Sequence, residues 1–262
     1  MKSKFIYLLV FVLLVITASE MIGFQSIAVG NIKIGLLPLV FAILITMLLG
    51  LPFLRKGVLQ KVYSPENVKF ASKNLIFIML PLMARYGADV APHLQEILKL
   101  GWIFLFQELG NLGTVVLGLP VALFLGLRRE AIGSTLGLGR EGELAYITEK
   151  YTLDSPEGRG VLSLYIIGTL FGAIFFSIIA PVMLDLGFRV EALAIASGMG
   201  SASMMTASSS SLVARIPDMQ STILAYASAS QLLTSFLGTF TMVFLAVPLQ
   251  RFVYRLFVRS EN

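Results

Sequence analysis

The stretch SGMGSASMMTASSSSL, residues 197–212, decides the fold because it interrupts an apolar segment with glycines and hydroxyls. Non-helical backbone at membrane depth is tolerated only where it is buried in protein or lines a wet cavity. Close packing of helices through small side chains explains Gly200, Ser201 and Ala202. It explains the four consecutive serines less well, because they face every side of a helix. Packing and a ligand site therefore both remain as interpretations of this stretch.

The composition around this stretch is that of a membrane protein. Of 262 residues, 56% are hydrophobic and 13% are charged, and the mean hydropathy is +0.85. A soluble domain carries about 25% charged residues. We therefore predict an all-α polytopic membrane protein with about seven transmembrane helices, at residues 5–17, 34–54, 74–100, 102–127, 161–184, 192–213 and 222–249.

The Lys and Arg distribution predicts the orientation. With the N-terminus in the cytoplasm of a cell (inner or plasma) membrane, thirteen basic residues fall inside and six outside. Arg251, Arg255 and Arg259 of the tail then lie outside, and Arg215 lies inside. If the segment at 192–213 were a re-entrant hairpin, the tail would lie inside. A basic start followed by an apolar run also resembles a cleaved signal peptide, although the run is long enough to predict an uncleaved first helix.

Two halves of the chain match weakly. The sequences LLPLVFAILITMLLGLPFL and IIGTLFGAIFFSIIAPVML align, as do FQELGNLG and SQLLTSFLG. We expect one membrane domain, 1–262, containing an inverted repeat of three spans, each with a broken central helix. Its parts are an extra N-terminal helix (1–33), repeat one (34–127), a cytoplasmic linker (128–160), repeat two (161–249) and a basic tail (250–262). Within the linker, SPEG predicts a helix start at Ser155, and SPEN at 64–67 repeats that signal.

Glycine- or proline-interrupted segments at matching positions of two repeats indicate a transport site. The third and sixth segments have this character. The candidate substrate-binding residues are Arg85, Gly87, Asp89, Gly198, Gly200, Ser201, Ser203, Ser208, Ser209, Ser210 and Ser211. Arg85 and Asp89 are also spaced to form a mutual ion pair on one helix face.

Ionisable residues within spans are functional hypotheses by default. The candidate ion-coupling residues are Gln107, Glu108, Asn111 and Gln231. Ser228, Ser230, Thr234 and Ser235 form a weaker matching face in the seventh segment. An alternative role for Glu108 is to anchor its helix near the outer interface.

Several classes are excluded by absent residue types. The sequence has no cysteine, one histidine and no G-x-x-x-x-G-K-[ST] loop, so we expect no metal, no catalytic residue and no ATP-driven step. The net charge of +5 is explained by cytoplasmic loops and does not indicate nucleic acid.

REGELAYITEKYTLDSPEGRGVLSLYIIGTLFGAIFF (140–176), followed by GMGSASMMTASSSSL (198–212), resembles a prokaryotic membrane family known as domain of unknown function 3100. The resemblance implies a multi-pass membrane protein and names no substrate. At fold level, a repeat of span, broken span and span resembles the bile-acid-transporter and NhaA-type fold. Those transporters carry extra scaffold helices, which a homodimer would supply here.

These features favour a secondary transporter of a small polar or anionic solute, such as an organic acid or amino acid, coupled to H⁺ or Na⁺. Its partners would be the lipid bilayer and the solute. The alternative is a non-transporting regulatory or holin-like subunit. An enzyme is not expected.

Overall fold

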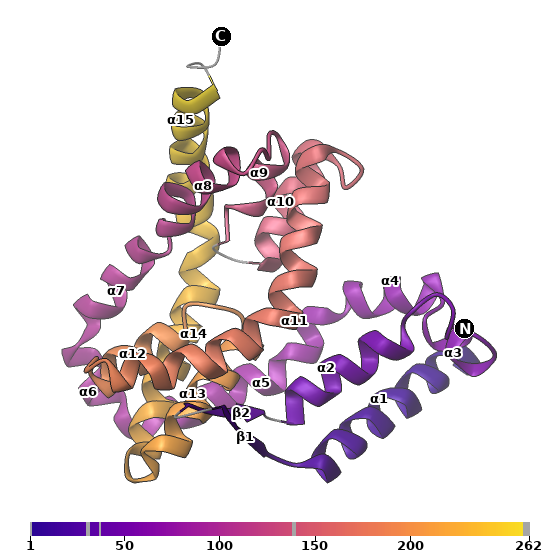
Figure 1. The fold of residues 1–262 in the computed structure, drawn as a ribbon, viewed down its shortest axis with the longest axis horizontal. Helices are drawn as coiled ribbons and strands as arrows, with labels where there is room; N and C mark the ends of the chain where they lie inside the picture. Colours follow the sequence, from indigo (N-terminus) through magenta and orange to yellow (C-terminus); the bar gives the residue numbers. More distant parts are fainter. Residues whose placement is uncertain (1, 30–31, 37, 138–139, 259–262) are drawn as a thin grey trace. The chain divides into compact units, whose positions relative to one another are not determined.

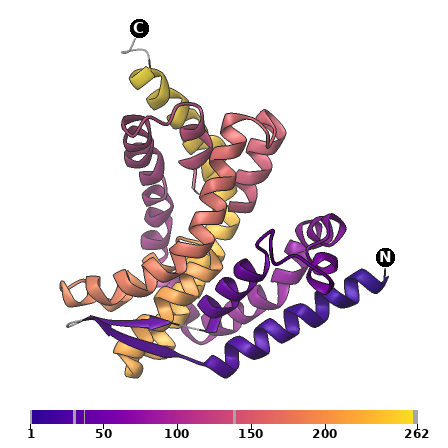
Figure 2. The ribbon, with the colours of Figure 1, turned by 45° about the vertical axis from the view of Figure 1, so that its right-hand side comes forward.

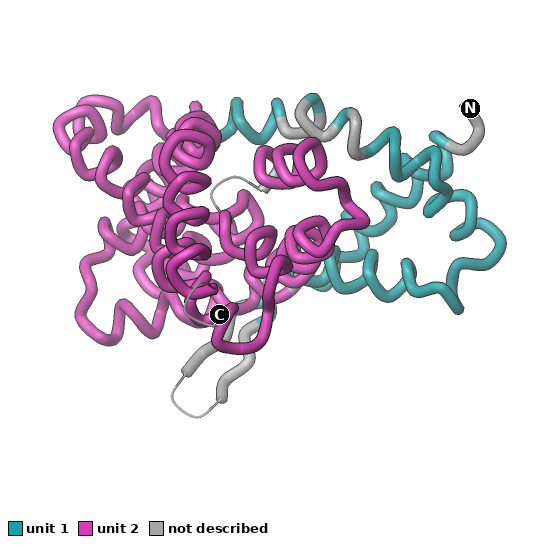
Figure 3. The backbone as a smooth tube through the Cα atoms, turned by 90° about the horizontal axis from the view of Figure 1, so that it is seen from above, with its two compact units in different colours: residues 1–86 teal, residues 87–262 magenta. Residues whose placement is uncertain are grey.

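The computed structural model describes residues 2–29, 32–36, 38–137 and 140–258. The chain divides into two compact units, residues 1–86 and residues 87–262 (Figure 3). The described residues are almost entirely helical (Figure 1). The exception is a two-stranded antiparallel hairpin, β1 (Gln25–Val29) and β2 (Ile32–Leu36). β2 includes residues 34–36, which the sequence assigns to the start of the second span, so that part of the prediction is wrong.

Unit 1 is built around the long apolar helix α1 (Lys2–Ile22). Its other helices are α2 (Pro38–Leu49), α3 (Val58–Val62), α4 (Pro65–Lys73) and most of α5 (Leu75–Val90). Aromatic contacts join these helices, such as Phe11 with Tyr63 at 5.6 Å between ring centroids. The predicted helix start at SPEN is confirmed, because α4 begins at Pro65 and Ser64 accepts a hydrogen bond from the Asn67 amide at 3.4 Å.

Unit 2 contains the end of α5 and ten further helices with four short 3₁₀ or π segments. The first are η1 (Ala91–His93), α6 (Leu94–Lys99), α7 (Gly101–Gly110), η2 (Thr114–Gly118), α8 (Leu119–Phe124), α9 (Glu130–Ser134) and α10 (Arg140–Tyr151). The rest are α11 (Pro156–Asp185), α12 (Val190–Ser197), α13 (Ala202–Arg215), η3 (Pro217–Met219), α14 (Gln220–Thr241), η4 (Met242–Ala246) and α15 (Val247–Val258).

Two segments of unit 2 share an irregularity. Both η2 and η4 are π segments, and a proline follows each, Pro120 and Pro248, within the pattern Leu-x-x-Pro. Proline removes a backbone donor and crowds the carbonyl four residues earlier. A π segment shifts local hydrogen bonding to partners five residues apart and relieves that crowding. The two segments are therefore related in sequence and in backbone geometry.

These two segments run in the same direction. Gln107 contacts Ser230, Val115 shares a core with Met242, and Leu123 packs with Val253, so both chains advance together. Figures 1 and 2 show α7–α8 and α14–α15 rising toward the same end of unit 2. An inverted repeat requires corresponding spans to run in opposite directions. The predicted inversion is thus not confirmed for this pair of segments.

The helix between them runs the other way. α11 begins beside α9, where Arg129 bonds Glu157, and ends beside the start of α12. The chain then turns through α12 and α13 and returns, because Arg215 at the end of α13 bonds Asp185 at the end of α11. The sixth predicted span is therefore a pair of short helices whose two ends lie close together.

In the part of the chain that the structure describes, three helices are long and apolar enough to cross a membrane: Phe5–Ile22, Gly101–Phe124 and the 42-residue segment Pro217–Val258. A fourth candidate is α11, whose halves meet at a 54° bend. α2 is apolar but has only 12 residues. The protein is thus a helical protein with membrane-like helices, and the predicted number of seven spans is not confirmed.

The linker closes one end of unit 2. Ser155 caps α11 as predicted, since its Oγ accepts from the Gly158 amide at 2.9 Å. Glu157 is buried and accepts two hydrogen bonds from Arg129, at 2.8 and 3.2 Å. That hydrogen bond and the Glu157 charge raise the pKa of Arg129. Gln250 of α15 donates to the carbonyl of Ile132 at 2.8 Å, so the tail helix is attached to the linker.

Candidate functional site

The helix α7 is polar on its protein-facing side and apolar on its exposed side. Gln107 and Glu108 are 7% and 6% exposed, whereas Phe106 and Leu109 are 61% and 52% exposed. This arrangement is the reverse of a soluble helix. It is expected where lipid, which is as apolar as leucine, surrounds the helix.

The buried polar face of α7 meets hydroxyls on α14. Ser230 donates to Gln107 Oε1 at 2.7 Å, and Thr234 donates to Glu108 Oε1 at 2.8 Å. The Gln107 amide donates in turn to the Ser230 carbonyl at 3.3 Å and to Thr234 Oγ1 at 3.4 Å. Thr234 therefore links the amide of Gln107 to the carboxylate of Glu108. We call Gln107, Glu108, Asn111, Ser230 and Thr234 the polar cluster.

Glu108 is the ionisable member of the polar cluster. Its second oxygen accepts from Asn111 Nδ2 at 3.3 Å and from Thr241 Oγ1 at 3.5 Å. All of these partners are neutral, and within the described residues no lysine, arginine or histidine pairs with this carboxylate. A charged carboxylate is costly to bury beside neutral partners alone, which makes Glu108 a candidate ligand for a cation.

Gln231 lies beside the polar cluster in sequence but bonds elsewhere. Its amide donates to Ser235 Oγ at 3.2 Å. Its Oε1 is buried and has no hydrogen-bond partner among the described residues. An unpaired buried acceptor is destabilising by about 1–3 kcal/mol unless water, an ion or a ligand satisfies it.

The helix break in residues 198–201 adjoins the polar cluster. Ser201 caps α13, accepting from the Met204 amide at 3.4 Å. A Cβ added at Gly198 would lie 2.4 Å from Ser230 Cβ and 2.5 Å from the Ala227 carbonyl, so this backbone packs directly on α14. A Cβ on Gly110 of α7 would lie 3.2 Å from the Met199 methyl. The predicted break thus lies against both helices that form the polar cluster.

The serine run itself is helical and mostly satisfied locally. Ser209 donates to the Met205 carbonyl at 2.8 Å and Ser211 to the Ser208 carbonyl at 2.7 Å. Ser208 bonds Ser197 at 2.7 Å and ties α13 to α12. Ser203 bonds Ser201 at 3.0 Å, while Ser210 is half-buried and Gly200 is exposed. Such contacts are typical of helix packing, one of the two interpretations of this stretch; the other is a ligand site.

The candidates of the third segment are placed differently. Gly87 and Asp89 lie inside α5, which continues to Val90, and the helix is interrupted one turn later at η1. Asp89 accepts from Ser228 Oγ at 3.5 Å, which brings it to α14 within unit 2. Arg85 is an exposed residue of unit 1.

The structure adds Thr241 to the candidate residues and strengthens Ser230 and Thr234. Ser230, Thr234 and Thr241 are spaced i, i+4 and i+11, which places their hydroxyls on one face of α14. That spacing in an apolar segment is the signal that identifies them. Among the described residues, no three His, Cys, Asp or Glu side chains lie close enough to hold a metal ion.

Comparison with known proteins gives one match. A family model described as "Protein of unknown function (DUF3100)" matches residues 17–256. No curated protein and no solved structure matches the chain.

Proposed function

The chain belongs to the DUF3100 family, and we propose that it is a secondary transporter of a small polar or anionic solute, coupled to H⁺ or Na⁺. The observation that carries this proposal is the buried Glu108, held by neutral donors between two helices that are candidate membrane spans. A charge at that depth is unfavourable, and such residues mark ion or substrate pathways.

The coupling step follows from the chemistry of Glu108. Binding of H⁺ or Na⁺ would neutralise the carboxylate, and its release would restore the charge. Thr234 and Asn111 donate to the oxygens of Glu108, so a change in the charge of that carboxylate changes these hydrogen bonds. Because Thr234 is on α14, the packing of α7 on α14 would change as well. A two-state packing of this kind is what converts ion binding into alternating access.

The solute would bind beside the polar cluster, at the break in residues 198–201. Broken helices offer free backbone donors and acceptors at membrane depth. The contacts of Gly198 with Ser230 and of Met199 with Gly110 support coupling between break and cluster. In this proposal α12–α13 is a re-entrant hairpin in the cell membrane, the N-terminus is cytoplasmic, and the broken-helix plan is shared with bile-acid-transporter and NhaA-type proteins at fold level only.

The test uses the purified full chain in liposomes. A panel of organic acids and amino acids is applied while solute-driven current and internal pH are recorded, with and without Na⁺. Wild type should give a current with at least one solute, and Glu108→Gln should reduce it at least tenfold by fixing the neutral form. Glu149→Gln, which removes an exposed carboxylate from α10, is the matched control and should leave the current unchanged.

Two results would contradict the proposal. Equal currents in wild type and Glu108→Gln would remove Glu108 from the coupling step. No current with any member of the panel, from protein that is folded and correctly inserted, would favour a non-transporting subunit.

A further inference from the structure

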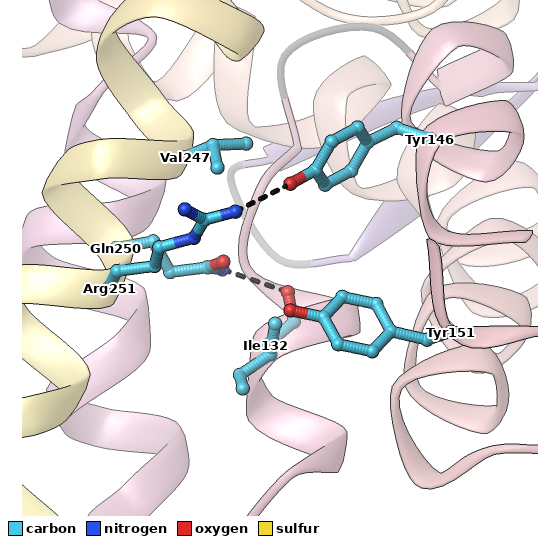
Figure 4. Close-up of a pocket in the computed structure, with 6 residues that line it drawn as sticks. All are labelled: Ile132, Tyr146, Tyr151, Val247, Gln250 and Arg251. Carbon is cyan, nitrogen blue, oxygen red and sulfur yellow. Dashed lines mark hydrogen bonds between the residues drawn. The ribbon is translucent and has the colours of Figure 1, made fainter. Parts of the chain in front are cut away.

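A hollow in unit 2 lies between the linker and the tail helix, away from the polar cluster. Its lining residues are Ile132, Tyr146, Tyr151, Val247, Gln250 and Arg251. Figure 4 shows Tyr146 and Tyr151 pointing from α10 toward Gln250 and Arg251 of α15. Val247 and Gln250 are buried, so the floor of the hollow is fixed.

Two cations converge on the hydroxyl oxygen of Tyr146, Arg251 from the lining of the hollow and Lys150 from beside it. Lys150 Nζ donates to Tyr146 Oη at 2.8 Å, and Arg251 Nη2 donates to the same oxygen at 3.4 Å. Lys150 Nζ also lies 5.2 Å from the ring centroids of both tyrosines, which holds the ammonium in place. Two positive charges this close repel each other unless an anion joins them.

Within the described ranges, the acidic residues nearest in the linker are paired with other cations and do not neutralise Lys150 and Arg251. Glu157 is bonded to Arg129, and Glu130 is bonded to Arg159 at 3.3 Å. Within the described residues, neither Lys150 nor Arg251 forms an ion pair with a carboxylate. The hollow is therefore left with uncompensated positive charge and three polar groups on its walls.

The length of the last helix places this hollow at the edge of the membrane. Pro217–Val258 has 42 residues, which is far more than the ~20 that cross a bilayer. If the span lies around the polar cluster, α15 extends beyond the hydrocarbon core. Basic pockets at that level, flanked by tyrosines, are suited to phosphate groups. Arginine adds a planar pair of donors that matches phosphate oxygens.

We propose that the hollow between α10 and α15 is a phosphate-binding site. Arg251 and Lys150 provide the charge, and the Tyr146 hydroxyl, which accepts from both, is free to donate its proton to a phosphate oxygen. The phosphate belongs either to the headgroup of an anionic phospholipid or to a soluble phosphate compound, since both present the same chemistry. This site is independent of the transport proposal, because it shares no residue with the polar cluster.

The experiment measures thermal stability of the full chain in nanodiscs. One arm compares phosphatidylglycerol with phosphatidylcholine, and the other titrates inorganic phosphate into phosphatidylcholine discs. Arg251→Gln and Lys150→Gln should each weaken the stabilisation or the phosphate affinity at least threefold. Arg255→Gln, an exposed arginine one turn further along α15 that does not line the hollow, is the control and should change neither.

The arms separate the two sources of phosphate. Stabilisation by phosphatidylglycerol alone assigns the site to a lipid headgroup, and stabilisation by inorganic phosphate assigns it to a soluble compound. The proposal is overturned if neither probe stabilises the protein. It is also overturned if Arg255→Gln weakens the effect as much as Arg251→Gln, since the attraction would then be general surface charge.

Discussion

Ser209 and Ser211 on α13 bond carbonyls of their own helix, whereas Gln107 and Glu108 on α7 bond groups on α14. Both regions are buried and polar, and both stood out in the sequence. The serines satisfy themselves locally, so they behave as small packing residues. The polar cluster is satisfied only when two distant helices meet. Polarity in a membrane helix therefore indicates function more strongly when its partners are remote.

The largest effect is expected where the two regions touch. Gly198→Ala places a Cβ 2.4 Å from Ser230 and should separate α12 from α14, with a loss of about 3 kcal/mol or more and a lowered yield of folded protein. Gly200→Ala is the matched control, because its Cβ would meet no backbone atom of another helix and only the side chain of Met204, with Sδ at 3.1 Å and Cβ at 3.3 Å. Thermal unfolding in detergent measures both. Equal tolerance of the two variants would show that the break does not press on α14.

An intermediate effect separates remote from local bonding. Thr234→Val keeps the shape but leaves Gln107 and Glu108 each without one partner, and should lower the free energy of unfolding by about 1–2 kcal/mol. Ser209→Ala removes a hydroxyl that bonds its own helix and should change it by about 0.5 kcal/mol or less. Unfolding in mixed micelles gives both values. If Ser209→Ala were the more harmful, the distinction between the two regions would fail.

The smallest effect is expected at the half-buried carboxylate of Glu130, outside both regions. A hydrogen bond from the residue's own backbone, followed by Arg159, lowers the pKa of Glu130. The stabilisation from a lowered pKa is present above the unfolded pKa and is lost as pH falls through the folded pKa. Glu130→Gln should therefore slightly lower stability at neutral pH and flatten its fall below about pH 4.5. Unfolding midpoints between pH 3 and pH 7 test this, and an unchanged acid slope would contradict it.

Local chemistry was readable in the sequence. The caps at Ser64 and Ser155 and the break after Ser197 follow from spacing and residue type. The same spacing groups Gln107, Glu108 and Asn111, but their burial depends on the contact with α14. The direction of the matching helices was not readable, because apolar segments align equally well either way. It depends on where the chain goes after α11, and the return of Arg215 to Asp185, a contact between residues 30 positions apart, is not visible in any local pattern. The third segment stays helical through Gly87 and is interrupted only at η1, because a helix tolerates a single glycine.

The hydrogen bonds of Gln250 to Ile132 and Thr135 bear on how the chain is oriented during insertion. They attach the tail helix to the linker, so both lie at the same end of unit 2. If that end faces the cytoplasm, as the basic linker predicts, Arg251 and Arg255 are counted with the cytoplasmic basic residues and Arg215 with the outer ones. The excess of cytoplasmic over outer basic residues is then larger than in the seven-span topology. In that topology the basic tail lies in the cytoplasm, in agreement with the excess of Lys and Arg expected there, and would help to orient the last span.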